Sequence, residues 1–190
     1  MKIIFIIISL WGIFPGELFH GSSSIDFNPN RLNKEIERQF KIANFQKDEI
    51  VLNDIIQSEE IISGKFYRLS VNDSVFGYAY LGRVNSCRKN GCSAPNINMI
   101  DETTEFFDYF ILYTSSKMIL NVVVYNYEAT HGQEITAKGW LKQFIGYNGN
   151  SELVVGKNID AISGATISVY GIVDDIQVKT SLTHRIVNIK

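Results

Sequence analysis

The middle of the chain contains four segments with the composition of β-strands: residues 66–69, 75–84, 106–113 and 118–127. Aromatic and β-branched residues dominate them, and the short polar stretches 72–74 and 115–117 separate the members of each pair as turns. Such tight reversals join antiparallel strands. Because the segments do not alternate regularly with helical patterns, the sequence predicts an α+β fold, with helices packed on an antiparallel sheet.

Helical patterns flank this block of strands. Residues 33–45 carry Ile36, Phe40 and Ile42 among charged residues, which predicts an amphipathic helix, and residues 50–56 form a further strand or helix. A second helix is expected from about Ile135 to Phe144. A third is expected to begin near Thr166, because apolar residues recur after it at the spacing of one helix face: Val169, Ile172, Val173 and Ile176.

Length and charge limit the class of protein. A chain of 190 residues with 45% hydrophobic residues and a net charge of −2 is suited to one compact domain, which we expect over residues 24–190. The 18 basic residues are balanced by 20 acidic ones and form no run, so nucleic acid is not an expected partner.

The first 23 residues have the pattern of a secretory signal peptide. Lys2 precedes an apolar run over residues 3–14, and Pro15-Gly16 and the small polar residues 21–24 follow it. The run is shorter than the ~20 residues that usually span a bilayer. Cleavage after Ser23 and retention as an N-terminal anchor both remain open. Either way, we expect export to the periplasm or to the outer face of the cytoplasmic membrane.

Cys87 and Cys92, the two cysteines, lie in a loop-like stretch over residues 85–95. In an exported protein their simplest state is a local disulfide, and the alternative is a redox relay. Closing a loop this short with a disulfide stabilises the folded protein by only about 2 kcal/mol, so the bond would fix the shape of the loop and would not be what stabilises the fold. Neither these cysteines nor His131 has partners at the spacing of metal ligands, so no metal site is predicted.

Residues 160–166, Asp-Ala-Ile-Ser-Gly-Ala-Thr, combine hydroxyls with a small-residue turn just before the third predicted helix. Thr166 would lie at the helix N-terminus, where free backbone N–H groups and the helix dipole favour a phosphate. Gly164 and Ala165 leave space around it, and Ser163 is a capping or phosphate-contacting hydroxyl. From these residues alone, an ordinary strand-to-helix turn without a ligand is an equal alternative.

This stretch resembles the flavinylation motif of the FMN-binding domain family, which includes flavin-carrying components of the sodium-translocating NADH:quinone reductase and of the Rnf complex. That motif reads Asp, two variable residues, Ser or Thr, Gly, Ala, Thr, and each fixed position is filled here. The resemblance implies that Thr166 carries FMN through a phosphoester bond made by a separate flavin transferase. It also implies that Asp160 belongs to what the transferase recognises, and that Ile162, Ser163, Gly164 and Ala165 lie near the cofactor.

A second stretch resembles the same family more weakly. Residues 128–135 and 138–146 are similar to its Glu-Thr-Pro-Gly loop and the Trp-Leu-x-x-Phe-x-Gly helix that packs against the flavin region, although no Pro follows Thr130. This similarity makes Thr130, His131, Gly132 and Glu134 candidate cofactor contacts. The resemblance also implies the FMN-binding-domain fold.

The function expected from these features is that of an exported flavoprotein, which relays electrons between membrane redox proteins and is not a stand-alone catalyst. No catalytic residue is predicted, because the flavin would carry the electrons. Two alternatives stay open: a module that binds FMN noncovalently, and a secreted structural domain without a cofactor.

Overall fold

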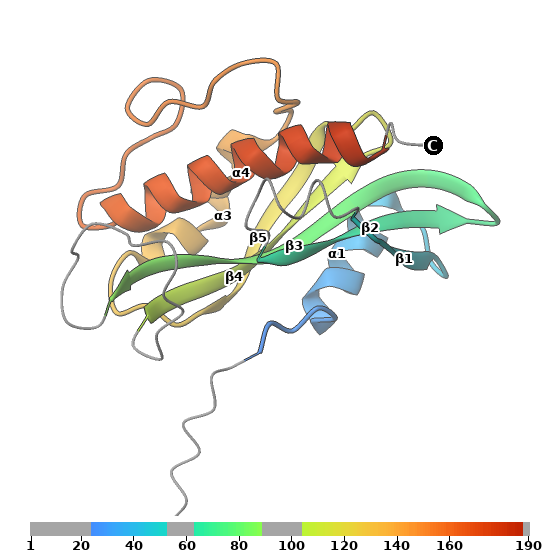
Figure 1. Ribbon diagram of the computed structural model, residues 1–190, viewed down its shortest axis with the longest axis horizontal. Coiled ribbons are helices and arrows are strands. Elements are labelled where there is room, and N and C mark those ends of the chain that lie inside the picture. Colours follow the sequence, from blue (N-terminus) through green and yellow to red (C-terminus); the bar gives the residue numbers. More distant parts are fainter. Residues whose placement is uncertain (1–23, 53–62, 89–103, 188–190) are drawn as a thin grey trace, which may run out of the picture.

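The computed structural model describes residues 24–52, 63–88 and 104–187, and it confirms the expected α+β class. A five-stranded antiparallel sheet has the order β1-β2-β3-β4-β5, so each strand lies beside its neighbour in sequence (Figure 1). The strands are β1 Gln46–Ile50, β2 Gly64–Val71, β3 Ser74–Arg88, β4 Thr104–Thr114 and β5 Ile119–Tyr127. The predicted signal peptide lies outside the described residues. Within them, no helix has both the length and the hydrophobicity needed to cross a membrane.

Both predicted hairpins are present. Asn72 and Asp73 have φ angles of 48° and 64° at the β2–β3 turn, a left-handed conformation that Asn and Asp tolerate. The strands are longer than predicted, since β2 begins at Gly64 and β3 reaches Arg88. Cys87 therefore belongs to β3 and not to a loop. The predicted disulfide cannot be assigned, because Cys92 lies outside the described residues.

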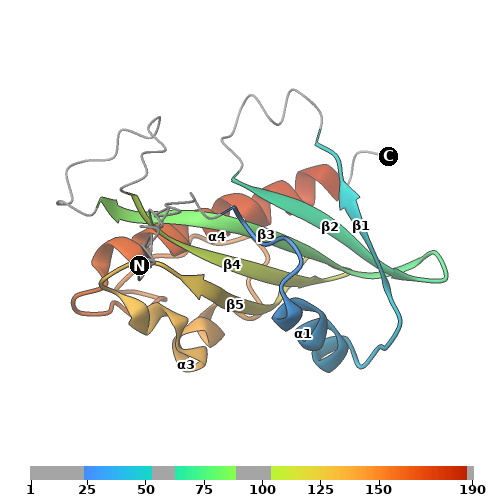
Figure 2. The ribbon, with the colours of Figure 1, turned by 90° about the horizontal axis from the view of Figure 1, so that it is seen from below.

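The sheet is covered on both faces. Along β4, Phe107, Tyr109, Ile111 and Tyr113 belong to one buried cluster, and Phe110 and Leu112 belong to another. Successive side chains of a strand point to opposite faces, so β4 contributes to two cores. Helix α4, Thr166–Val187, packs on the first face, and α1, Asn30–Phe40, packs on the second (Figure 2).

Helix α1 is shorter than the predicted range of 33–45, because Lys41 takes a left-handed φ of 56° and ends it. Leu32 and Ile36 are fully buried against the sheet. The Arg31 guanidinium donates to the Val124 carbonyl at 3.0 Å, and the Asn121 amide donates to Glu35 at 3.2 Å. These two bonds attach α1 to β5, an edge strand.

The predicted helix over 135–144 is wrong as a single element. The chain instead forms a 3₁₀ turn at Gln133–Thr136, the one-turn helix α3 at Lys138–Leu141, and a second 3₁₀ turn at Lys142–Phe144. Ala137 is extended, with φ −66° and ψ 123°, and it separates the first two. Residues Ile135 and Trp140 lie about 140° apart on a continuous helix, so the break allows both to face the core.

Helix α4 buries an ion pair against the sheet. The Lys179 ammonium lies 3.2 Å from one oxygen of Asp175, and the Tyr109 hydroxyl donates to the other oxygen at 2.5 Å. The Lys179 side chain is 3% exposed and that of Asp175 is 21% exposed. Burial raises the pKa of Asp175 above its usual value, and Lys179 and Tyr109 offset only part of this effect.

We expect Asp175 to make the stability depend on pH. Because its pKa is higher in the folded than in the unfolded protein, the folded state holds the proton more tightly, so the free energy of unfolding should fall as pH rises from about 4 through the raised pKa. Asp175→Asn keeps the shape and removes this fall, whereas the exposed neighbour Asp174→Asn should retain it. Urea unfolding between about pH 3 and about pH 8 measures the difference, and parallel curves for the wild type and Asp175→Asn would contradict the expectation.

Candidate functional site

The segment from Asp160 to Thr166 forms the turn that leads into α4. The Ala165 N–H donates to the Ile162 carbonyl at 3.2 Å, and Gly164 takes a left-handed φ of 81° between them. Helix α4 begins at Thr166, the residue predicted from the sequence. A positive φ at the third position of such a turn favours glycine, which explains why Gly stands there.

Thr166 is exposed at a helix end that can hold a phosphate. The first helical bond runs from the Val169 N–H to the Ala165 carbonyl, at 2.9 Å. The N–H groups of Thr166, Ile167 and Ser168 therefore have no carbonyl one turn earlier, and Ala165 has no side chain that could cap them. Ser163 and Thr166 are both exposed, so both hydroxyls are accessible at this end of the helix. The donor set suits a phosphate ester at this position.

The loop over residues 130–134 lies against the same helix end. Gly132 has a φ of 87°, and a Cβ added to it would lie 2.9 Å from the Ser168 hydroxyl oxygen and 3.3 Å from the Ala165 Cβ. The two stretches singled out in the sequence therefore meet, although about 30 residues separate them. Gly132 is buried at this contact, whereas His131 and Glu134 are exposed beside it.

A chain of hydroxyl groups joins strand, loop and helix beneath this contact. The Tyr127 hydroxyl donates to the His131 carbonyl at 2.5 Å, and the buried Ser168 hydroxyl lies 3.3 Å from the Tyr127 oxygen and 2.8 Å from that of Ser86. Because a carbonyl oxygen can only accept, the Tyr127 hydroxyl uses its one proton in the bond to His131. The Ser168 hydroxyl therefore donates to Tyr127, and the Ser86 hydroxyl donates to Ser168. Burial raises the pKa of Tyr127, so the phenol keeps this proton at neutral pH.

Alanine substitutions at two glycines of the site test how much the contact between the loop over residues 130–134 and α4 contributes to stability. Gly164→Ala should cost about 1–2 kcal/mol from left-handed strain alone, because its added Cβ meets nothing within 4 Å. Gly132→Ala carries the same strain and also drives a methyl group into the Ser168 and Tyr127 hydroxyls, so it should cost about 1–3 kcal/mol more. Urea unfolding of the two variants measures the difference, and equal losses would show that the loop is not packed on α4.

Asp160 is held by its backbone, which leaves its side chain exposed. The Trp140 indole N–H donates to the Asp160 carbonyl at 2.8 Å, and the Asp160 N–H donates to the Gln143 side-chain oxygen at 2.7 Å. Trp140 is 9% exposed and meets Phe144 edge to face, with centroids 5.4 Å apart. Its position supports the turn and does not offer a ring face for a ligand to stack on.

Sequence reasoning missed the polar residues behind the loop. Thr130 donates a hydrogen bond to Glu105, which is 7% exposed at the start of β4. Ser86 lies at the end of β3, and 82 residues separate it from Ser168. Single Ser and Glu residues at strand ends carry no local pattern, so only the pairing of β3 and β4 brings them to the site.

Comparison with models of known protein families found no match to this chain, and comparison with curated proteins found none either. The interpretation of the site therefore depends on its residues and their geometry.

Proposed function

We propose that this chain is an exported flavoprotein with the FMN-binding-domain fold, which carries FMN through a phosphoester on Thr166 and relays electrons between redox proteins at the membrane. The observation that carries the proposal is the exposed Thr166 hydroxyl at the first position of α4, after a glycine turn and beside the loop over residues 130–134. Every helix begins with backbone N–H groups that lack an intrahelical partner, so the proposal depends on the exposed Thr166 hydroxyl together with the resemblance of residues 160–166 to the flavinylation motif.

Each part of the site has a role in this proposal. The backbone N–H groups of residues 166–168 offset the phosphate charge, and the space beside Gly164 is open, since a Cβ there would meet nothing within 4 Å. The exposed carboxylate of Asp160 is available to the flavin transferase that forms the bond. Bound FMN supplies the electron-transfer chemistry, and the protein holds the cofactor and shapes its surroundings.

Covalent attachment has a physical advantage in an exported protein. A cofactor held only by noncovalent contacts dissociates at a finite rate, and no FMN pool outside the cytoplasm replaces it. A phosphoester keeps the site filled whatever the noncovalent affinity is. In this proposal the loop residues Thr130, His131, Gly132 and Glu134 contact the flavin, and its exposed edge passes electrons to membrane partners.

Co-expression of the full-length protein with a flavin transferase tests the proposal. We expect the intact mass to rise by one FMN less one water, and we expect yellow colour and in-gel fluorescence to survive denaturation. Flavin that is released on denaturation would replace the covalent model by the noncovalent one. A protein without flavin under all conditions would overturn both and leave the structural domain.

A further inference from the structure

A cavity lies on the face of the sheet that α1 covers, opposite α4. It provides about 360 Å³ of space, partly open to solvent, between the N-terminal end of α1, the segment before it and strands β4 and β5. Its lining consists of Ser24, Asp26, Pro29, Asn30, Arg31, Asp108, Tyr125 and Asn126, and combines polar with apolar surface. The volume is at the lower end of the range for small-molecule sites. None of these residues belongs to the Thr166 site.

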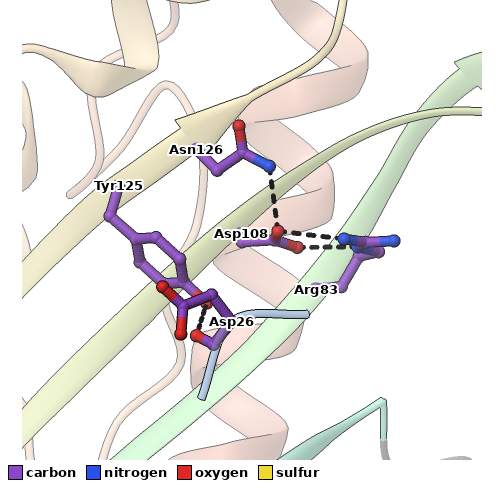
Figure 3. A network of polar contacts seen from close by, with 5 residues as sticks. All are labelled: Asp26, Arg83, Asp108, Tyr125 and Asn126. Atoms are coloured by element: carbon purple, nitrogen blue, oxygen red, sulfur yellow. Dashed lines mark hydrogen bonds and ion pairs between the residues drawn. The ribbon is translucent and has the colours of Figure 1, made fainter. Parts of the chain in front are cut away.

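Asp108 and Asn126 in the lining belong to a row of three polar residues across three strands, and the third member, Arg83, lies outside the lining. Arg83 on β3 pairs in register with Asp108 on β4, which pairs with Asn126 on β5 (Figure 3). Two guanidinium N–H groups donate to the two Asp108 oxygens at 2.7 and 2.9 Å, and the Asn126 amide donates to one of them at 3.1 Å. Asp108 is 1% exposed, so the row is held rigidly.

This polar row interrupts an otherwise apolar face. The residues beside it on that face include Leu81, Phe110 and Val123, all buried. A buried ion pair is commonly no more stabilising than well-packed apolar residues of the same size, because both charges lose their water. The fold alone therefore does not require Arg83, Asp108 and Asn126 at these positions. Asp108 and Asn126 line the cavity, so ligand binding gives a reason for the polar row.

The wall of the cavity is formed before any ligand binds. The Tyr125 ring stacks on Phe110, with centroids 6.1 Å apart, and its hydroxyl donates to the Asp26 carbonyl at 2.8 Å. The Asp26 carboxylate in turn accepts from the Asn28 N–H at 2.8 Å. Lys47 anchors the same segment by donating to the Asn28 side chain at 2.8 Å. Preformed walls reduce the entropy that binding costs.

We propose that this cavity binds a neutral, polyhydroxylated molecule the size of one sugar ring. The charge of Asp108 is offset by its ion pair with Arg83, which lies outside the lining, and the two other charged lining residues, Asp26 and Arg31, have opposite signs, so the lining favours neither an anion nor a cation. Carboxylate and amide groups together accept from and donate to several hydroxyls at once. The Tyr125 ring offers the apolar surface that the C–H groups of a sugar need. This proposal is independent of flavin binding.

The proposal can be tested by titrating the full-length protein with D-glucose, D-galactose and myo-inositol. Calorimetry and ligand-observed NMR measure the binding. We expect at least one of them to bind saturably at one site, and we expect glucosamine and glucose 6-phosphate to bind no more tightly than glucose. Asn30→Ala and Asp26→Ala, both exposed at the rim, should each weaken binding by about three- to tenfold. The control Asn150→Ala lies in a loop outside the lining and should change nothing.

Three results would overturn the proposal: no saturable binding of any of the three compounds, tighter binding of a charged analogue, or affinity unchanged in both rim variants. Circular dichroism of each variant separates loss of binding from loss of fold.

Discussion

Thr166→Ala should abolish the covalent flavin adduct completely while leaving the fold intact. The variant lacks the one hydroxyl at the first position of α4, so no phosphoester can form there. Thr166 is exposed, and substitutions at exposed positions usually change stability by less than about 0.5 kcal/mol. Intact-mass spectrometry after co-expression with a flavin transferase measures the loss, and circular dichroism and urea unfolding confirm the fold.

Ser163→Ala is the matched control for this variant. Ser163 lies in the same turn and is also exposed, so its hydroxyl is an alternative attachment point for the phosphate. We expect Ser163→Ala to retain the adduct. An adduct that persists in Thr166→Ala, or that disappears only in Ser163→Ala, would show that FMN is attached to a residue other than Thr166. The protein would still be a flavoprotein.

Gly82→Ala should destabilise the protein by about 3 kcal/mol or more, the upper end of the cost of overpacking a core. An added Cβ at Gly82 would lie 2.0 Å from the Tyr80 hydroxyl oxygen and 2.4 Å from its Cζ. Tyr80 cannot easily move aside, because it is fully buried against Phe66 and Tyr109, with ring centroids at 4.8 and 5.8 Å. The midpoint and slope of guanidinium chloride unfolding give the loss.

Gly139→Ala provides the comparison, since a Cβ there meets nothing within 4 Å and α3 is helical. Alanine favours a helix over glycine by about 0.5–1 kcal/mol, so this variant should be neutral or slightly more stable. If the two alanine variants unfold at the same denaturant concentration, Tyr80 yields to the methyl group and the core is looser than the structure indicates.

The sheet could be predicted because its signals are local. The turns at residues 72–74 and 115–117 separate strand-like segments, and the left-handed conformations of Asn72, Asp73 and Lys117 agree with turns there. Strand ends were predicted less well. The start of β2 shows why. Gly64 belongs to β2 because it pairs with Gly82 on β3, and this pairing is not visible in either segment alone.

The succession of short helical turns over 133–144 could not be predicted from periodicity, because its buried residues do not share one face of a regular helix. Tertiary contacts decide its shape, including the bond from the Trp140 indole to the Asp160 carbonyl. The candidate site likewise has one part that could be predicted from local sequence and one part that could not. The turn before Thr166 is a local pattern, whereas the contact between Gly132 and Ser168 and the bond between Ser86 and Ser168 depend on strands that meet only in the folded chain.

The attachment of α1 to β5 has a consequence for how the molecule meets its neighbours. A free sheet edge presents backbone groups that can recruit a strand from another chain, which leads to aggregation. Here Arg31 occupies the Val124 carbonyl on one edge of the sheet. The opposite edge, β1, is only five residues long and carries Lys47, Asp48 and Glu49. Both borders therefore resist strand addition, which protects the folded chain from self-association.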